Sequence, residues 1–337
     1  MSAAAPLPAL GVDISYVIPI YNEEESLAQL VAALQDMLTQ AGPKYSVEVL
    51  LVDDGSRDRS WELIEQAAHA DARMCGIRLS RNFGHQVALT CGYHFARGRA
   101  VICLDADLQD PPEVSLRMIK AWEEGADIVF AVRAERRGET SFKLATACLF
   151  YWLIEQIGNV KVPRNSGDFR LLSRRALNAL NELPERHRYI RGLVGWVGFK
   201  TATITYERHA RVAGVTKYPL AKMVKFATDA VVSMSVTPLR MAYLLAIGLS
   251  TPFLLYMLYS FFLWAIGSKQ IEHGWPSTIF AIIVFGAANL FFIGILGEYV
   301  GRIYEEAKNR PLYVVQETTR AALTAPTGGS RSPGQAN

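Results

Sequence analysis

The sequence contains little cysteine and has little net charge. Its 337 residues include four cysteines, with no Cys-x-x-Cys pair and no histidine–cysteine spacing that fits a zinc site. Neither a disulfide framework nor a zinc domain is therefore indicated, and we expect buried, reduced thiols. The net charge of +3 is too small to suggest a nucleic-acid partner.

Several diagnostic motifs are also missing. No G-x-G-x-x-G follows the first expected strand, and no G-x-x-x-x-G-K-[ST] occurs anywhere, which argues against dinucleotide redox chemistry and P-loop hydrolysis. Residues 1–11 lack a basic start and a long apolar stretch, so they are not expected to be a signal peptide. The stretch 321–337 is rich in Ala, Thr, Gly, Ser and Pro, which predicts disorder.

Long uncharged runs are present, in the last third of the chain. Residues 241–266 contain no charged side chain, residues 277–297 form a second apolar run, and a short polar link separates them. Each run is long enough to span a bilayer, so we predict two transmembrane helices, the first kinked at Pro252.

The charges beside these runs predict their orientation. The link carries one Lys, one Glu and one His, whereas basic residues flank the outer ends of both runs. Because positive charge marks the cytosolic side, we expect both termini in the cytosol of a bacterial inner membrane protein. The flanking residues are Lys217, Lys222, Lys225, Arg240, Arg302, Lys308 and Arg310.

The first 210 or so residues alternate apolar strands with helical patterns. Strands are expected at 15–20, 47–52, 76–79, 100–104 and 127–132, with amphipathic helices between them. Asn22, with Glu25 three residues later, predicts a capping box at the start of the first helix. This repetition predicts an α/β fold with a mainly parallel, doubly wound sheet.

Two other stretches combine basic and apolar residues. Residues 141–157 and 218–236 each have the pattern of an amphipathic helix lying on a membrane surface. For the first stretch, an ordinary helix packed on the core is an equally good interpretation.

Acidic residues follow two of the expected strands. One strand leads into Asp53-Asp54-Gly55-Ser56, and another leads into Asp105-Ala106-Asp107-Leu108-Gln109-Asp110. Ligands of parallel α/β sheets bind at the carboxyl ends of the strands, and clustered carboxylates need a compensating cation. Mg²⁺ or Mn²⁺ suits carboxylates and is commonly shared with substrate phosphates, so we predict a metal–diphosphate site.

The ordered set of motifs resembles family 2 glycosyltransferases with a GT-A fold. The segments are V-I-P-I-Y-N-E-E-E-S-L, V-D-D-G-S, S-R-N-F-G-H and L-D-A-D-L-Q-D-P-P-E. Later segments, including G-D-F-R-L-L-S-R, A-G-V-T-K-Y and L-G-E-Y-V-G-R-I-Y, resemble the polyprenyl-phosphate glycosyltransferases with two membrane spans. The resemblance covers roughly residues 14–316, and Thr216 stands where Ser is more usual.

This resemblance implies roles for individual residues on the donor side. Pro19, Tyr21, Glu23 and Asp53 would contact the nucleoside of a nucleotide sugar, and Asp105 and Ala106 would lie by its ribose and diphosphate. The implied metal ligands for Mg²⁺ or Mn²⁺ are Asp105, Asp107 and Gln109.

It also implies a polyprenyl phosphate acceptor. Arginine and lysine side chains suit a phosphate group and an anionic membrane surface. The candidates are Arg133, Arg136, Arg137, Lys143, Arg164, Arg170 and Lys217, although Arg136 and Arg137 can equally be solvated surface charges.

The expected reaction is inverting transfer, with candidate catalytic residues Asp107, Asp168 and Arg133. A phosphate monoester has a second pKa near about 6 and is already nucleophilic at neutral pH. We therefore expect Asp168 to orient a substrate rather than accept a proton, with a nearly normal rate in Asp168→Asn. The histidines favour structural roles, although His85 lies beside the donor edge.

Other interpretations remain open. A processive polysaccharide synthase would usually carry Q-x-x-R-W and more spans, and an inactive membrane scaffold would not need the acids at Asp53, Asp105 and Asp107. UDP-glucose is the preferred donor, with UDP-N-acetylhexosamine, GDP-mannose and a UDP-aminoarabinose derivative as alternatives. The resemblance also suggests a homotetramer.

These inferences define the expected domain organisation. An extension precedes a cytosolic transferase domain, which is followed by a juxtamembrane helix, a helical hairpin and a cytosolic tail. The extension is expected at 1–13, the transferase domain at 14–215 and the juxtamembrane helix at 216–238. The two membrane spans are expected at 239–267 and 277–300, with a periplasmic link at 268–276, and the tail at 301–337.

Overall fold

The computed structural model describes residues 11–134, 166–207, 236–266 and 275–320. The chain forms two compact units, one of Met1–Met223 with Pro311–Asn337 and one of Val224–Arg310. The expected amphipathic helices at 141–157 and 218–236 fall almost wholly outside the described residues.

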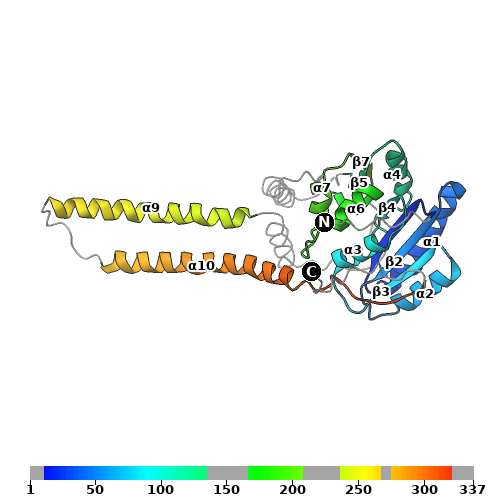
Figure 1. Ribbon diagram of the computed structural model, residues 1–337, viewed down its shortest axis with the longest axis horizontal. Coiled ribbons are helices and arrows are strands. Elements are labelled where there is room, and N and C mark those ends of the chain that lie inside the picture. Colours follow the sequence, from blue (N-terminus) through cyan, green and yellow to red (C-terminus); the bar gives the residue numbers. More distant parts are fainter. Residues whose placement is uncertain (1–10, 135–165, 208–235, 267–274, 321–337) are drawn as a thin grey trace, which may run out of the picture. The chain divides into compact units, whose positions relative to one another are not determined.

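The first unit is built on one eight-stranded mixed sheet (Figure 1). Its order is β7-β5-β6-β4-β1-β2-β3-β8, and β4, β1, β2 and β3 form a parallel core. The strands are β1 Ile14–Ile20, β2 Val47–Asp53, β3 Met74–Leu79, β4 Ala100–Cys103, β5 Ile128–Arg133, β6 Ser166–Ser173, β7 Thr201–Tyr206 and β8 Val315–Thr318.

Helices cover both faces of this sheet. On one face, α1 Glu24–Ala41, α2 Ser60–Ala70 and α4 Val114–Glu123 pack on residues such as Tyr16 and Ile18 of β1. On the other face, α3 His85–Phe95 packs so closely that a Cβ at Gly92 would lie 2.1 Å from Val17 Cγ1. Successive strand residues point to opposite faces, and both faces are buried, which explains why the central strands are apolar throughout.

This architecture confirms the mainly parallel, doubly wound α/β sheet and the GT-A type of fold. The mixed character comes from β6, which pairs antiparallel with β4 and β5, and from β8, which pairs antiparallel with β3. Helix α6 Arg174–Glu182 and the short α7 Ile190–Trp196 follow β6 and precede β7. Buried, unpaired thiols are confirmed for Cys75, Cys91 and Cys103, and Cys148 lies outside the described residues.

The predicted capping box at Asn22 is wrong. Helix α1 begins at Glu24 without a side-chain cap, and Asn22 has left-handed backbone with φ of 53°. The Asn22 side-chain oxygen accepts a hydrogen bond from Arg57 N at 2.9 Å instead. Asparagine tolerates this backbone region, so the residue links two loops rather than capping a helix.

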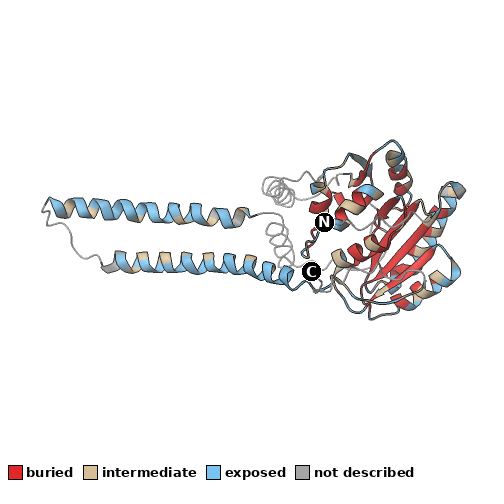
Figure 2. Cartoon of the chain, viewed as in Figure 1, coloured by how far each residue is buried: buried red, intermediate tan, exposed pale blue. Residues whose placement is uncertain are grey.

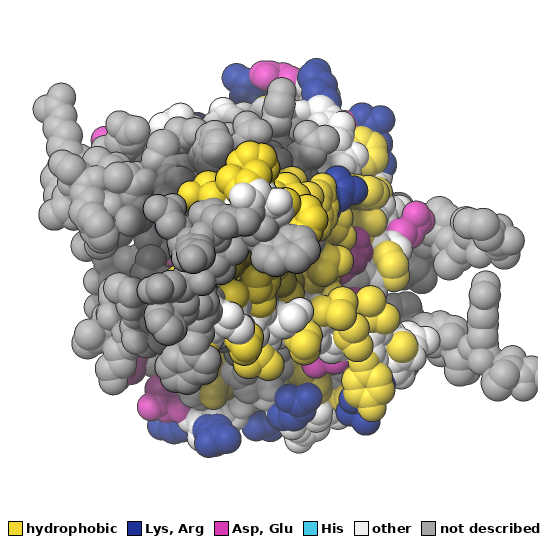
Figure 3. Space-filling model, turned by 90° about the vertical axis from the view of Figure 1, so that its left-hand side faces the viewer, with side chains coloured by type: hydrophobic (Ala, Val, Ile, Leu, Met, Phe, Trp, Pro, Cys, Tyr) yellow, Lys and Arg dark blue, Asp and Glu magenta, His cyan; other side chains and the backbone are white. Residues whose placement is uncertain are grey.

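The second unit is a hairpin of two long helices, α9 Thr237–Ala265 and α10 Trp275–Ala307. Phe253 of α9 contacts Phe280 and Phe285 of α10. Segments Ala242–Leu263 and Thr278–Ala307 are long and apolar enough to cross a membrane. Their exposed side chains (Figure 2) are largely hydrophobic, and the end-on view of Figure 3 shows hydrophobic side chains gathered in its centre, which indicates membrane association.

Beyond the hairpin, the chain returns to the sheet of the first unit. Strand β8 pairs with β3, and Thr319 bonds Gly76 through both its backbone N–H and its hydroxyl. Tyr313 forms a 2.9 Å hydrogen bond with His94 of α3. No sequence signal predicted this strand, because it is short and its pairing partner lies more than 200 residues earlier in the chain.

Candidate functional site

The polar segments predicted from the sequence meet at one edge of the sheet. Ile20 is opposite Asp53 in the β1–β2 pair, and Val17 is opposite Cys103 in the β1–β4 pair. The loops after these parallel strands therefore begin side by side, as expected for a ligand site at the carboxyl ends of strands.

The loops after β1 and β2 are fastened to each other. Asn22 N donates to Ser56 Oγ at 3.0 Å, and Glu23 N donates to Ser60 Oγ at 2.9 Å. These bonds satisfy backbone groups outside the regular elements and fix the path of the first loop. Tyr21, in that loop, keeps 42% of its surface exposed, so its ring is available to a ligand.

Asp53 ends β2 as a fully buried carboxylate. Its Oδ1 accepts a hydrogen bond from Ser56 N at 3.0 Å, and its Oδ2 lies 3.3 Å from Arg78 Nε. Burial raises the pKa of Asp53, against the lowering effects of Ser56 and Arg78. The group is thus held in place with few hydrogen bonds.

Asp54, which is not among the predicted ligand-binding residues, holds the next loop in place. Its two carboxylate oxygens accept hydrogen bonds from Phe83 N and Gly84 N, at 2.7 and 2.9 Å. Gly84 has φ of 101°, in the region that favours glycine, and immediately precedes α3. Asp54 therefore sets the position of His85, the first residue of α3.

Asp105 lies just beyond β4, and its Oδ1 is buried without a hydrogen-bond partner among the described residues. Burial and the nearby Asp168, Asp110 and Asp107 carboxylates raise the pKa of Asp105 to about 6, although His85 opposes the shift. A buried carboxylate oxygen with no bonded donor is costly on its own, so this position fits a cation that completes it.

The rest of this segment has unusual backbone. Leu108 has φ of 54°, a value that few bulky residues adopt, and Gln109 N donates to Asp107 Oδ1 at 3.2 Å. The side chain of Gln109 is buried, whereas Asp107 is partly exposed. Such backbone outliers concentrate at ligand sites, which agrees with a functional loop.

Asp168, in the middle of β6, is surrounded by cations. Arg170 Nη2 donates to Asp168 Oδ1 at 2.6 Å, and Arg191 donates to both carboxylate oxygens at 3.0 and 2.9 Å. Burial alone would raise the pKa of Asp168, but His85, Arg191 and Arg170 hold it well below its usual range. Asp168 is therefore a persistent anion and a weak proton acceptor.

His85 joins the two carboxylates. Its Nε2 lies 3.8 Å from Asp105 Oδ1 and 3.4 Å from Asp168 Oδ2, and potential ligand atoms of all three residues lie within 4.8 Å of one another. Burial lowers the pKa of His85, yet Asp168 and Asp105 outweigh it and raise the pKa overall. This cluster contains one predicted metal ligand, Asp105, together with two residues not predicted as ligands.

Arg133 closes the opposite side of the segment after β4. Its Nη2 lies 3.6 Å from Asp110 Oδ2, and its Nε donates to Tyr206 Oη at 3.3 Å; Tyr206 in turn donates to Asp110. A Cβ at Gly167 would lie 2.9 Å from Arg133 Nη2, so glycine makes room for the guanidinium. Arg133 thus supports the Asp105–Asp110 segment.

The described structure leaves some predicted residues untested. Arg170 is fully buried and bonds Asp168 and the backbone oxygens of Asp168 and Gly167, so in this conformation it does not offer a phosphate its guanidinium. The remaining acceptor candidates lie outside the described residues: Arg136, Arg137, Lys143, Arg164 and Lys217.

Arg191 was missed as a site residue. No local pattern links it to a carboxylate 23 positions earlier. His85 carried a usable signal, because it directly follows the polar loop after β3.

Comparison with known proteins shows the family of this chain. The family model described as "Glycosyl transferase family 2" matches residues 15–180. The uncharacterized glycosyltransferase YkcC of Bacillus subtilis is 43% identical over 307 residues, covering 91% of this chain and 94% of its own length. The SfII prophage-derived bactoprenol glucosyl transferase of Shigella flexneri is 36% identical, covering 91% and 98%. A prophage bactoprenol glucosyl transferase homolog of Escherichia coli is 35% identical, covering 91% and 99%. With relatives this similar along nearly the whole chain, the protein belongs to glycosyltransferase family 2.

Proposed function

We propose that this enzyme transfers glucose from UDP-glucose to a polyprenyl phosphate, with inversion, at the cytosolic face of a bacterial inner membrane. The observation that carries the proposal is the buried Asp105 Oδ1, which has no hydrogen-bond partner among the described residues and lies at the sheet edge where a sugar diphosphate would bind. The names of the Shigella and Escherichia relatives support a bactoprenol acceptor and a glucosyl group.

The residues at this edge fit a divalent cation. Asp105 and Asp107, with Gln109, would hold Mg²⁺ or Mn²⁺, which prefer oxygen ligands. When bound, the cation would neutralise the nucleoside diphosphate leaving group. His85 and Asp168 lie close enough to Asp105 to complete the surroundings of the sugar diphosphate.

The chain's own residues would bind and orient the substrates. Pro19, Tyr21, Glu23 and Asp53 would hold the nucleoside, and Ala106 would pass close to the ribose. Asp168, fixed by Arg170 and Arg191, would orient the sugar or the acceptor as an anion rather than remove a proton. The acceptor phosphate needs no strong base, since it is largely dianionic at neutral pH.

The acceptor side of the proposal rests on charge and membrane association. Arg133 would face the donor or acceptor phosphate from the end of β5, with Arg136, Arg137, Lys143 and Lys217 as further candidates. The apolar α9–α10 hairpin would keep the transferase domain at the surface where a polyprenyl phosphate is embedded. A homotetramer is part of this proposal through the resemblance alone.

A donor screen tests the function. Membranes containing the protein are incubated with undecaprenyl phosphate, Mg²⁺ or Mn²⁺ and a radiolabelled nucleotide sugar, and labelled lipid is extracted into organic solvent. We expect label from UDP-glucose, lost on chelation of the metal. Label from GDP-mannose or UDP-N-acetylhexosamine instead would correct the donor, and no labelled lipid from any donor would reject the proposal.

A further inference from the structure

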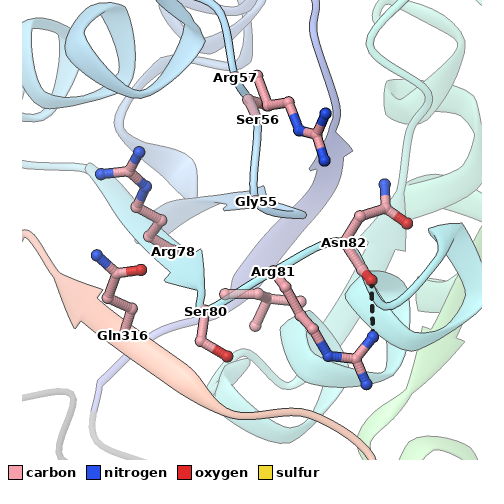
Figure 4. Close-up of a pocket in the computed structure, with 9 residues that line it drawn as sticks. Gly55, Ser56, Arg57, Arg78, Ser80, Arg81, Asn82 and Gln316 are labelled. Carbon is pink, nitrogen blue, oxygen red and sulfur yellow. Dashed lines mark hydrogen bonds between the residues drawn. The ribbon is translucent and has the colours of Figure 1, made fainter.

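A cavity of about 280 Å³ lies beside Asp53, and no role has yet been assigned to it. Its walls come from the loop after β2, from the end of β3 with the loop that follows, and from β8. Figure 4 shows Gln316 of β8 next to Arg78 of β3, with Gly55 and Ser56 across from them. The volume suits one part of a small molecule rather than a whole drug-sized ligand.

The cavity lies along the line that a donor nucleotide would follow. Strands β4, β1, β2 and β3 are consecutive neighbours, so the ends of β4 and β3 are three strand spacings apart, about 14 Å. Asp105 follows β4, Asp53 ends β2, and the cavity lies at the end of β3. A nucleoside diphosphate with its phosphates near Asp105 would thus extend its base past Asp53 toward the cavity.

Arg78 connects the cavity to Asp53 and to β8. Its guanidinium contacts Asp53 Oδ2 at 3.3 Å through Nε and Glu317 Oε1 at 2.9 Å through Nη1, and it lies over the Trp61 ring. A side chain held by three partners is preorganised and pays little entropy to bind. The segment beyond the membrane hairpin therefore helps to hold an arginine that lines the cavity.

The chemistry of the walls fits a nucleobase. Gln316 offers an amide that both donates and accepts, Arg78 offers a planar guanidinium, and Ser56 and Ser80 offer hydroxyls. The lining contains no carboxylate, but Asp53 beside it supplies an acceptor for a ring N–H. A pyrimidine such as uracil presents an N–H between two carbonyls, which this arrangement of acceptor and donors complements.

The β8 backbone is held in place beside the cavity by its pairing with β3. Ser80 N donates to Val314 O at 2.9 Å, directly beside the cavity, and Arg78 is paired with Glu317 in the β3–β8 register. A Cβ at Gly55 would lie 2.4 Å from the backbone carbon of Arg81, so the two loops that form the remaining walls also touch. Gln316 is thus presented by a rigid element rather than by a free tail.

Resting on the proposed function, we infer that Gln316 of β8 is a donor-binding residue that contacts the nucleobase. The segment that follows the hairpin thereby completes the nucleotide site of the transferase domain. If the amide of Gln316 makes one hydrogen bond to the base, its removal should lower the affinity for the nucleotide about three- to tenfold.

Calorimetric titration of the detergent-solubilised full chain with UDP and Mn²⁺ tests this. We expect Gln316→Ala to weaken UDP binding about three- to tenfold and to leave binding of pyrophosphate with Mn²⁺, which lacks a base, unchanged. Val314→Ala is the matched control, because Val314 lies on the same segment, is exposed and contributes only its backbone to Ser80. A second variant, Gln316→Glu, should weaken UDP binding at least as much, since its carboxylate repels base carbonyls.

The outcomes separate this inference from the proposed function. Unchanged UDP affinity in Gln316→Ala, or an equal loss for UDP and pyrophosphate, would overturn the inference while wild-type nucleotide binding keeps the proposed function standing. A wild-type protein that binds no nucleoside diphosphate would overturn both. Equal melting temperatures of the variant and wild type would show that the loss is local.

Discussion

Strand β6 and the segment after β4 place two carboxylates of opposite character in one site. Asp105 Oδ1 is buried without a hydrogen-bond partner among the described residues, and the pKa of Asp105 is raised to about 6. Asp168 is more deeply buried, with 4% of its side chain exposed against 24% for Asp105, but it has His85, Arg170 and Arg191 around it, and its pKa is lowered. Burial penalises both anions, so the difference comes from the neighbouring charges: two arginines and His85 at Asp168, and mostly other carboxylates at Asp105.

This contrast assigns different tasks to two identical side chains. Among the described residues, Asp105 Oδ1 has His85 as its neighbouring cation, at 3.8 Å and without a hydrogen bond, whereas Asp168 is hydrogen-bonded by two arginines. The first is suited to binding a cation with the sugar diphosphate, and the second to holding a fixed negative charge beside it. Substitution of each carboxylate, and a change of pH, should therefore have different effects at the two positions.

Asp105→Asn should cost the most activity. It removes the charge that would bind the metal, so we expect transfer to fall by more than about 100-fold, beyond the 10–100-fold typical of outer-shell positions. Radiolabelled lipid formation measures this effect. Asp71→Asn, which alters an exposed pair with Arg73, serves as the control and should leave the rate unchanged. A rate for Asp105→Asn within tenfold of wild type would contradict the assignment.

Asp168→Asn should act mainly on stability. It would leave Arg170 buried without its countercharge, a change that typically costs about 3 kcal/mol or more and would lower the melting temperature by roughly 6–12 °C. The near-normal rate expected from the sequence is thus no longer the decisive measurement. The decisive readout is the pH profile of the remaining activity, measured where the variant is folded: an unchanged shape supports an orienting anion, and loss of a titrating limb would identify a base.

Metal affinity should depend on pH through Asp105. With a pKa of about 6, its carboxyl is protonated below that pH, and a cation must then displace the proton. We expect Mn²⁺ binding, followed by calorimetry at constant ionic strength, to weaken by up to about tenfold per pH unit below 6 and to level off above 7. Affinity that stays constant from pH 7 to 5 would show that Asp105 is not a ligand. Asp168 contributes no such dependence in this range, because its pKa is held low.

Much of the fold was predictable because its signals are local. Apolar strands ending in Asp53 and Asp105 predicted a parallel sheet with a polar edge, and the order of motifs identified the family. Two uncharged runs likewise predicted the helices α9 and α10. These features depend on periodicity and length, which neighbouring residues determine.

The features that the sequence did not predict depend on residues far apart in the chain. Asn22 is of a residue type that favours helix caps, yet its side chain accepts a hydrogen bond from Arg57 N, 35 positions later. Arg191 meets Asp168 only because α7 follows the return of β6 into the sheet, and Gln316 reaches the cavity only because β8 pairs with β3.

The sequence by itself therefore determined the parallel strands β1 to β5, the two long apolar helices and which edge of the sheet carries the acids. Only the tertiary structure decided that Asp168 is bonded by arginines whereas, in the described part of the chain, Asp105 Oδ1 is not. The physical reason is that a pKa depends on burial and on charges within a few ångströms, and in this site those charges come from α3, β6 and α7 together.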